Sequence, residues 1–385
     1  MRAFALAFLA GGTLLAGCVA RTQSSGDSEE LAAALPAAAA PIASDPVEGP
    51  ANAALADPPT PPSLTLETPA LVSSKLSIVA ADVGAGNCIA VQCPGSTDAL
   101  LMDCGTVEGL YPAPKPAIID PRAERAKQVM QPFLSGRNVR VVVTHPHADH
   151  LIFVPVVLEN VAVKGVWLGG YANDYGDRQD LDAKYHFGAW LQARKDEHVL
   201  TFTNYPTGYH TAATAEPKLK CGNASVRILT VNNGGSPNSR SLVTLLSFGN
   251  FKAIFPGDAE GSTEAAVLQN FAAEVQDTSV LFAAHHGADT QQSNGTSWVS
   301  ALRAQHVVYS SGTLYSHPNC ESVDRYRGGD DLLTSKKHSF TCGKHGGGKR
   351  TNQSLIAEYI TEEQGPVRIS TDGSTVSITC DKGPC

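Results

Sequence analysis

The order of apolar and polar residues along this chain predicts a series of short strands separated by helical segments. A helical pattern over Ala123–Gln131 precedes the apolar, β-rich run Val139–Thr144. Two further β-rich runs, Cys88–Cys93 and Ala99–Cys104, flank Pro94-Gly95-Ser96 and predict a β-hairpin. Strands and helices that alternate with short connections indicate a layered α/β domain.

The first 18 residues have the pattern of an export signal. Arg2 precedes the apolar run Ala3–Ala10, which is too short to span a bilayer and has the length of a signal-peptide core. The following run, Leu14-Leu15-Ala16-Gly17-Cys18, resembles the lipoprotein box of bacteria, in which the Cys is acylated and becomes the mature N-terminus. A plain secretory peptide with an incidental Cys18 is the alternative. Val19 is not acidic, which by analogy with Gram-negative lipoproteins favours the outer membrane, so we expect a lipid-anchored protein of the cell envelope, facing the periplasm or the exterior.

Residues 19–74 are rich in Ala, Pro and Ser and contain no aromatic residue. Such a segment buries too little apolar surface to offset the entropy lost on ordering, so we predict a disordered spacer before a domain over residues 75–385. The whole chain is 42% hydrophobic and 17% charged, as expected of a protein with a sizeable core. Its net charge of -8 provides no general attraction for nucleic acid or anionic lipid, although a bound metal ion would change the charge locally.

Cysteine usage agrees with export. Nine cysteines less Cys18 leave eight, and an even number in an oxidising compartment indicates disulfides, with 105 ways of pairing eight residues. Buried free thiols are the alternative, and a zinc finger is disfavoured because no Cys-x-x-Cys pair occurs. One pairing follows from the hairpin, because a turn centred near Ser96 places Cys88 opposite Cys104.

The clearest chemical signal lies at the end of the strand Val139–Thr144. The next six residues are His145-Pro146-His147-Ala148-Asp149-His150, with four side chains of the kinds that bind zinc, manganese or iron. Alternation places His145 and His147 on one side, and the following turn can direct Asp149 and His150 toward a second position. The alternative is a polar strand end with helix-capping residues, but four potential ligands within six residues make that a poor explanation.

The pattern His-x-His-x-Asp-His after an apolar strand resembles the signature of the metallo-β-lactamase superfamily. Two later strands end in matching motifs: Phe251–Phe255 leads into Pro256-Gly257-Asp258, and Val280–Ala284 leads into His285-His286-Gly287. The resemblance implies an αββα sandwich in which Asp258 bridges two metal ions and His286 is the last ligand. Each later motif alone is weak, but the ordered set is specific.

Finer features are similar to the soluble domain of ComEC-like competence proteins. They are Asp82-Val83-Gly84-Ala85-Gly86, Asp103-Cys104-Gly105, Asn238-Ser239-Arg240-Ser241-Leu242-Val243 and Ser316-His317-Pro318. The chain departs from that pattern at Asn87, where Asp is usual, and at Leu151-Ile152-Phe153, where small residues are usual and a bulkier wall beside the metals is therefore expected. Asn238 stands near the place of a missing third-motif His, which weakens one metal position.

The resemblance implies a metal-dependent hydrolase that uses a metal-activated water. Proposed ligands of one ion are His145 and His147, those of the other are Asp149, His150 and His286, and Asp258 lies between them. One or two divalent ions are expected, zinc first and manganese as the alternative. His285 and His317 are candidates for donating a proton to the leaving group or binding a substrate oxygen. The alternatives are a packing role for His285 and an ordinary turn role for His317.

The expected substrate is a phosphodiester, with DNA as one candidate. Hydrolysis of another ester, a lactone or an envelope phosphoester is the first alternative. A non-catalytic envelope binding protein on the same scaffold is the second. Clustering histidine and aspartate side chains without a metal costs free energy, which argues against the second alternative.

Overall fold

The computed structural model describes residues 72–197, 201–210, 216, 218–312, 314–327, 338–343, 349–354, 357–382 and 385. The export signal, Cys18 and all but the last three residues of the predicted spacer lie outside these residues. Among the described residues, no helix combines the length and the apolar character needed to cross a bilayer.

The first sheet has eight strands in the order β16-β15-β1-β2-β3-β4-β5-β6. Its strands are β1 (Leu76–Ala80), β2 (Cys88–Gln92), β3 (Asp98–Cys104), β4 (Asn138–Val143), β5 (Ala162–Leu168), β6 (Thr201–Asn204), β15 (Val367–Thr371) and β16 (Val376–Cys380). Neighbours from β3 to β6 run parallel, and the other neighbours run antiparallel. The predicted hairpin is confirmed as β2 and β3, whose register pairs Cys88 with Cys104.

The second sheet has six strands in the order β14-β11-β10-β9-β8-β7. Its strands are β7 (Ser225–Thr230), β8 (Val243–Phe248), β9 (Phe251–Phe255), β10 (Val280–Phe282), β11 (His306–Tyr309) and β14 (Glu358–Ile360). β8 pairs antiparallel with β7 and β9, whereas β9, β10, β11 and β14 run parallel. A separate antiparallel pair consists of β12 (His338–Gly343) and β13 (Lys349–Ser354).

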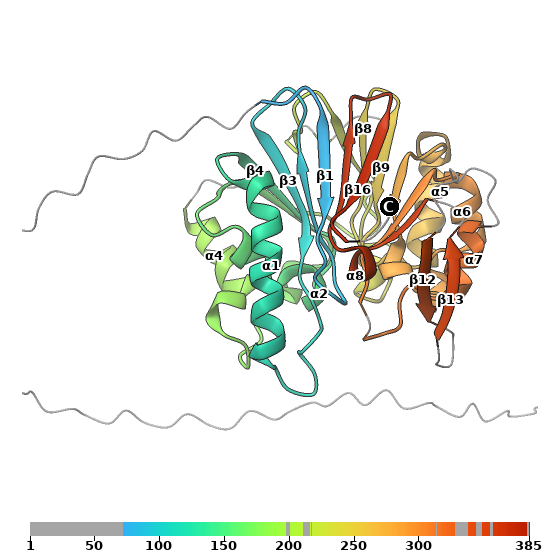
Figure 1. The fold of residues 1–385 in the computed structure, drawn as a ribbon. Coiled ribbons are helices and arrows are strands. Elements are labelled where there is room, and N and C mark those ends of the chain that lie inside the picture. The colour runs from blue at the N-terminus through green and yellow to red at the C-terminus, as the bar shows by residue number, and fades with distance from the viewer. Residues whose placement is uncertain are drawn as a thin grey trace, which may run out of the picture. The chain divides into compact units, whose positions relative to one another are not determined.

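The two sheets face each other, and helices cover their outer faces (Figure 1). The helices are α1 (Pro116–Leu134), α2 (Ala148–Leu151), α3 (Val154–Val157), α4 (Phe187–Asp196), α5 (Gly261–Val275), α6 (Thr296–Leu302), α7 (Cys320–Arg327) and α8 (Thr361–Gln364). Three cores follow from this layering: one between the first sheet and α1, α3 and α4, one between the sheets, and one between the second sheet and α5, α6 and α7. The predicted αββα sandwich is therefore confirmed.

The helix α1 extends beyond the predicted segment Ala123–Gln131 at both ends. Pro116 lies in its first turn, where the missing N–H has no helical partner to lose. Its buried residues recur every three or four positions as far as Phe133, with Leu134 adjacent, and pack on the first sheet: Ile119, Ala123, Ala126, Met130, Phe133 and Leu134. The longer helix thus follows from an apolar stripe that continues past the predicted bounds.

The eight cysteines of the domain form four disulfides: Cys88–Cys104, Cys93–Cys221, Cys320–Cys342 and Cys380–Cys385. The pairing of Cys88 with Cys104 is confirmed, whereas the sequence left the other three pairings open. Cys93–Cys221 spans 128 residues of sequence and ties the end of β2 to the chain before β7. In the chain-entropy picture, a loop of this length stabilises the fold by about 5 kcal/mol.

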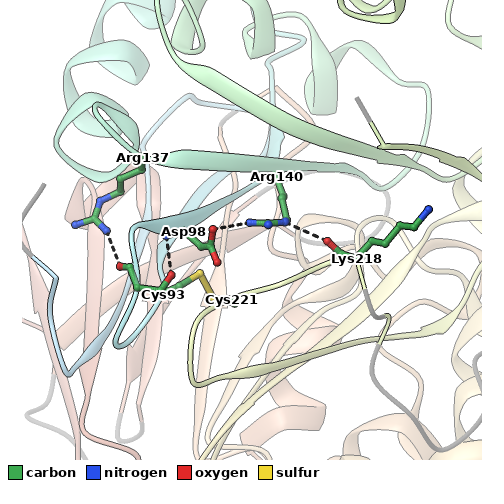
Figure 2. The surroundings of a disulfide bond; sticks show 7 residues. Cys93, Asp98, Arg137, Arg140, Lys218 and Cys221 are labelled. Atoms are coloured by element: carbon green, nitrogen blue, oxygen red, sulfur yellow. Dashed lines mark hydrogen bonds and ion pairs between the residues drawn. A yellow bond between two sulfur atoms is a disulfide. The ribbon is translucent and has the colours of Figure 1, made fainter. Parts of the chain in front are cut away.

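The surroundings of Cys93–Cys221 hold the same region together by polar contacts (Figure 2). Arg140 on β4 pairs with Asp98 at 2.8 Å through Nη1 and donates from Nε to the carbonyl of Lys218 at 3.1 Å. The backbone N–H of Cys93 donates to the carbonyl of Asp98 at 3.2 Å. The disulfide therefore joins segments that Arg140 already brings together.

Candidate metal centre

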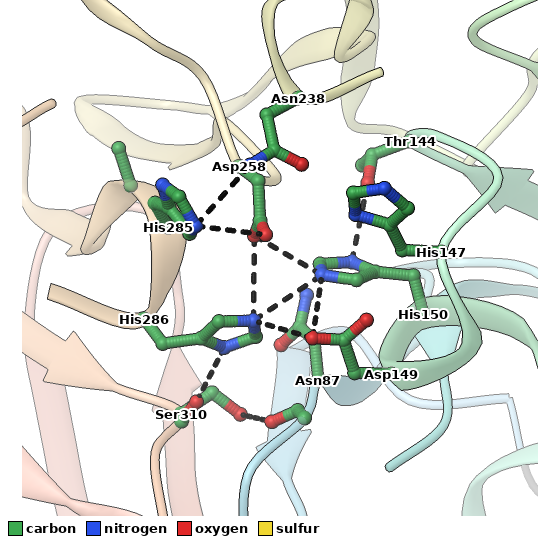
Figure 3. A network of polar contacts seen from close by, with 12 residues as sticks. Asn87, Thr144, His147, Asp149, His150, Asn238, Asp258, His285, His286 and Ser310 are labelled. Atoms are coloured by element: carbon green, nitrogen blue, oxygen red, sulfur yellow. Dashed lines mark hydrogen bonds and ion pairs between the residues drawn. The ribbon is translucent and has the colours of Figure 1, made fainter. Parts of the chain in front are cut away.

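The predicted ligands converge from loops that follow three strands (Figure 3). The chain leaves β4 through His145 and His147, and the short helix α2 then carries Asp149 and His150. Asp258 follows β9, and His285 and His286 follow β10. Because strands β4 and β9 belong to different sheets, the cluster lies where the two sheets of the sandwich meet.

The first group of ligand atoms consists of His145, His147 and Asp258. His145 Nε2 lies 3.0 Å from His147 Nδ1 and 3.7 Å from Asp258 Oδ2. Burial, together with the neighbouring His150, holds the pKa of His145 well below its usual value. His145 is therefore a neutral imidazole, the form in which histidine binds metals.

The second group consists of Asp149, His150, Asp258 and His286, all of them buried. His150 Nε2 and His286 Nε2 lie 3.3 Å apart. Asp258 Oδ1 is 3.0 Å from the first of these nitrogens and 3.4 Å from the second, and Asp149 Oδ2 is 3.4 Å from His286 Nε2. The two oxygens of Asp258 thus face the two groups separately, as expected of a bridging carboxylate.

Hydrogen bonds on the far side of each ring determine which nitrogen of His150 and His286 is protonated. His150 Nδ1 lies 2.8 Å from Asp103 Oδ2, and His286 Nδ1 lies 2.7 Å from the carbonyl oxygen of Ser310. Because these oxygens accept, both Nδ1 atoms must donate. In the neutral form of each ring, Nε2 then presents its lone pair to the cluster, and this arrangement of outer partners is common around metal-binding histidines.

The charges of the second group favour a cation inside it. Burial disfavours the imidazolium form of His150, but the carboxylates of Asp258, Asp103 and Asp149 outweigh burial and raise its pKa well above the usual value. The pKa of His286 is also raised, because Asp258 and Asp149 outweigh burial there. Burial alone would raise the pKa values of Asp149 and Asp258, but the neighbouring imidazoles lower them. Either buried protons or divalent ions would supply the positive charge.

The observed spacings fit a metal ion. Ligand atoms about 2.0–2.1 Å from a tetrahedral ion are about 3.3–3.4 Å apart, which follows from zinc–ligand distances. Four of the separations that involve an Nε2 atom of the second group are 3.0 to 3.4 Å, and the fifth, between His150 Nε2 and Asp149 Oδ2, is 4.0 Å. Asp258 Oδ1 makes no hydrogen bond among the described residues, although it is buried. The two facing lone pairs of His150 and His286 repel each other unless a cation lies between them, so these residues suit a metal ion.

His285 and His317 line the same region without belonging to either ligand group. His285 Nε2 lies 3.7 Å from Asp258 Oδ2 and 3.3 Å from Asn238 Nδ2. The ring of His317 has its centroid 6.0 Å from that of His285 and 6.4 Å from that of His286. Burial and these two imidazoles lower the pKa of His317 to about 3, so its ring is neutral. His285 therefore lies beside the ligand groups, and His317 lies next to His285 and His286.

Leu151, Ile152 and Phe153 do not form the bulkier wall that the sequence suggested. All three are buried in the core between the first sheet and its helices. A cavity of about 10 Å³ below the second group is lined instead by Asn87, Ile89, His150, Phe255, Pro256, Gly257, Asp258, Phe282, Ala283, His286 and Ser310. The expectation fails because α2 turns the following residues away from the ligands and into the core.

Sequence reasoning missed two groups that orient the ligands. Asp103 was recognised only as part of an Asp-x-Gly pattern, yet its carboxylate also accepts from the backbone N–H of Thr144 at 2.7 Å and from the Thr144 hydroxyl at 2.9 Å. The parallel pairing of β3 with β4 could have indicated that Asp103 lies beside the motif. The carbonyl of Ser310 has no sequence signal, because every residue carries one.

No protein-family model matches this chain, and no curated protein is similar to it in sequence. Among solved structures, it is similar to a metallo hydrolase from the archaeon Ignicoccus hospitalis (11% identity, TM-score 0.39, 72% of this chain and 99% of that one). It is also similar to CmlA, a diiron β-hydroxylase from Streptomyces venezuelae (15% identity, TM-score 0.38, 74% and 55%). A metallo-β-lactamase from Hirschia baltica is a third (10% identity, TM-score 0.28, 54% and 84%).

Proposed function

We propose that this protein is a metal-dependent hydrolase. The observation that carries the proposal is the pair of ligand groups sharing Asp258, whose two oxygens face different groups. Divalent ions held there would lower the pKa of a water to about 7 and polarise the bond to be cleaved, so no side-chain nucleophile is needed. Zinc is the first candidate, with manganese as the alternative.

The chain's own residues would orient the substrate and handle its proton. The His285 side chain is 16% exposed beside Asp258, so its exposed part can contact a bound molecule. His317 is neutral and can donate one N–H to a substrate oxygen or to the leaving group. Asp258 and Asp149 would hold the ions, and His285 lies beside Asp258, with its Nε2 3.7 Å from Asp258 Oδ2.

The proposed substrate is a phosphodiester, with DNA as one candidate. Support comes from the ComEC-like motifs and from the two adjacent ligand groups, because paired ions can stabilise both the attacking and the leaving oxygen of a phosphoryl centre. The site of action would be the cell envelope. The resemblance of Leu14–Cys18 to a lipoprotein box and the four disulfides of the domain support that location.

The test begins with metal analysis of the purified full chain. The same sample is then assayed on a small phosphodiester, on DNA, and on carboxylic ester and lactone substrates. We expect Asp149→Ala to lower turnover by more than about 100-fold, the upper range for loss of an outer partner alone. Asp381→Ala, which removes an exposed carboxylate paired with Arg368, is the matched control and should keep full turnover.

Three results would contradict this proposal. The first is a chain that binds no metal from metal-replete buffer, which would favour a binding protein. The second is cleavage of esters or lactones but not of phosphodiesters, which would reject the substrate class. The third is normal turnover in metal-loaded Asp149→Ala, which would reject the assigned ligands.

A further inference from the structure

Asn87 is held rigidly beside the second ligand group although it is not one of the predicted ligands. Its backbone N–H donates to the carbonyl of Asp149 at 2.9 Å, and its own carbonyl accepts from the N–H of Gly105 at the same distance. The residue is 9% exposed. Asn87 therefore connects the chain before β2 directly to the ligand-bearing helix α2.

The orientation of the Asn87 amide follows from its partner. Asn87 Nδ2 lies 3.1 Å from Asp103 Oδ2, an oxygen near which the Thr144 hydroxyl and His150 Nδ1 also lie. A carboxylate oxygen accepts hydrogen bonds, so the NH₂ group must face Asp103. The amide oxygen Oδ1 consequently points away from Asp103. This oxygen is buried and makes no hydrogen bond among the described residues.

Asn87 lines the cavity of about 10 Å³ below the second ligand group, together with His150, Asp258 and His286. In Figure 3 its side chain lies below His150, in the space between His286 and Asp149. Asp258 lines the same cavity, and its Oδ1 is also without a hydrogen bond among the described residues. Two residues that each carry a buried acceptor oxygen without a hydrogen bond among the described residues thus line one small space.

Nearby polar groups on this wall do not satisfy Asn87 Oδ1. The hydroxyl of Ser310 donates to the carbonyl of Gly86 at 3.2 Å, and His286 Nδ1 donates to the carbonyl of Ser310. The remaining nitrogens, His150 Nε2 and His286 Nε2, present lone pairs when their rings are neutral, the form that binds a metal ion. An amide oxygen, a carboxylate oxygen and two imidazole nitrogens on the residues around one small space suit a cation.

We propose that Asn87 Oδ1 is an additional, neutral ligand of the ion in the second group. The inference rests on the proposed metal centre and adds to it the choice of metal. Asn87 would raise the number of oxygen ligands relative to the two imidazoles of His150 and His286. Carbonyl and carboxylate oxygens suit harder ions such as Mn²⁺, whereas imidazole suits Zn²⁺. Asn87 therefore shifts the preference of this position from zinc toward manganese.

The test compares Mn²⁺ and Zn²⁺ binding to the metal-free full chain and to Asn87→Leu. Free Mn²⁺ is measured by electron paramagnetic resonance, and Zn²⁺ by competition with a chelating dye. We expect the substitution to weaken Mn²⁺ binding at the tighter site by about tenfold or more, the scale of effects on metal affinity from a neighbouring polar group, and Zn²⁺ binding much less. The ratio of the two affinities is the decisive quantity.

Thr144→Val is the matched control. It also removes one hydrogen bond to Asp103 Oδ2, but Thr144 does not line the cavity. The control should change both metal affinities by the same factor. An affinity ratio in Asn87→Leu equal to that of the wild type, whether both affinities fall or neither does, would overturn the proposal.

A second measurement does not depend on any variant folding. Anomalous diffraction from crystals of the wild-type chain loaded with Mn²⁺ should place Asn87 Oδ1 within bonding distance of the ion. An ion held by Asp149, His150, Asp258 and His286 without Asn87 would overturn the proposal. Neither experiment measures hydrolysis, so an inactive chain that binds both metals as expected would contradict the proposed function alone.

Discussion

The substitution Asp103→Asn tests whether an outer carboxylate orients His150 for metal binding. Asp103 Oδ1 accepts from the backbone N–H of Thr144 at 2.7 Å, and this donor cannot change its role. The amide oxygen of the new Asn must therefore face Thr144, which turns its NH₂ toward His150 Nδ1 and Asn87 Nδ2. His150 would then accept at Nδ1 and carry its proton on Nε2, where the metal should bind.

The magnitude follows from the contacts that Asp103 makes. The new NH₂ group faces the NH₂ of Asn87, so at least one buried donor loses its acceptor, at a cost of about 1–3 kcal/mol in unfolding free energy. The reverse orientation of the new amide directs its NH₂ at the N–H of Thr144 and has a similar cost. In addition, the wrong tautomer of His150 should weaken metal binding in the second group by about 10–100-fold, the range for loss of an outer partner.

Calorimetric titration of metal into the metal-free chain measures the affinity, and chemical denaturation measures the unfolding free energy. Asp98→Asn is the matched control, because it also neutralises a carboxylate on β3, but one that pairs with Arg140 away from the cluster. We expect the control to keep the wild-type affinity. Wild-type metal affinity in Asp103→Asn would refute the idea that Asp103 determines the tautomer of His150.

Three further predictions concern other parts of the chain. Mass analysis of the exported protein should find lipid on Cys18 and none in Cys18→Ser; a wild-type chain without lipid would reject the anchor. Metal should bind in two steps, because the group of His145 and His147 has one protein ligand fewer than the second group. Asn238→His should tighten the weaker step, and calorimetry showing two equal tight sites would count against this. Burial raises the pKa of Glu264 to about 8, despite hydrogen bonds from backbone N–H groups, and the residue is 3% exposed. The folded state therefore holds a proton that the unfolded state releases near pH 4.5, so the unfolding free energy should fall between about pH 4.5 and 8, by up to about 5 kcal/mol. Denaturation of Glu264→Gln at several pH values should show a flatter profile, and an unchanged slope would be the contrary result.

The sequence alone predicted the features that depend on residues close together in the chain. His145 to His150 are within six residues of one another, so the strand and turn that carry them largely determine which side chains face each position. The hairpin around Pro94-Gly95-Ser96 similarly predicted the Cys88–Cys104 pair. The sandwich architecture, Asp258 and His286 came from the order of several motifs, which together resemble a known family.

Only the tertiary structure decided the contacts between distant segments. The alignment of β3 with β4 places Asp103 on His150, and the approach of β11 to β10 places the carbonyl of Ser310 on His286. The position of Asn87 between α2 and the loop after β3 likewise depends on backbone hydrogen bonds across the sheet. Strand alignment and contacts with backbone carbonyls cannot be predicted from residue types. The free energy of these contacts depends on how whole sheets pack, not on a local sequence pattern.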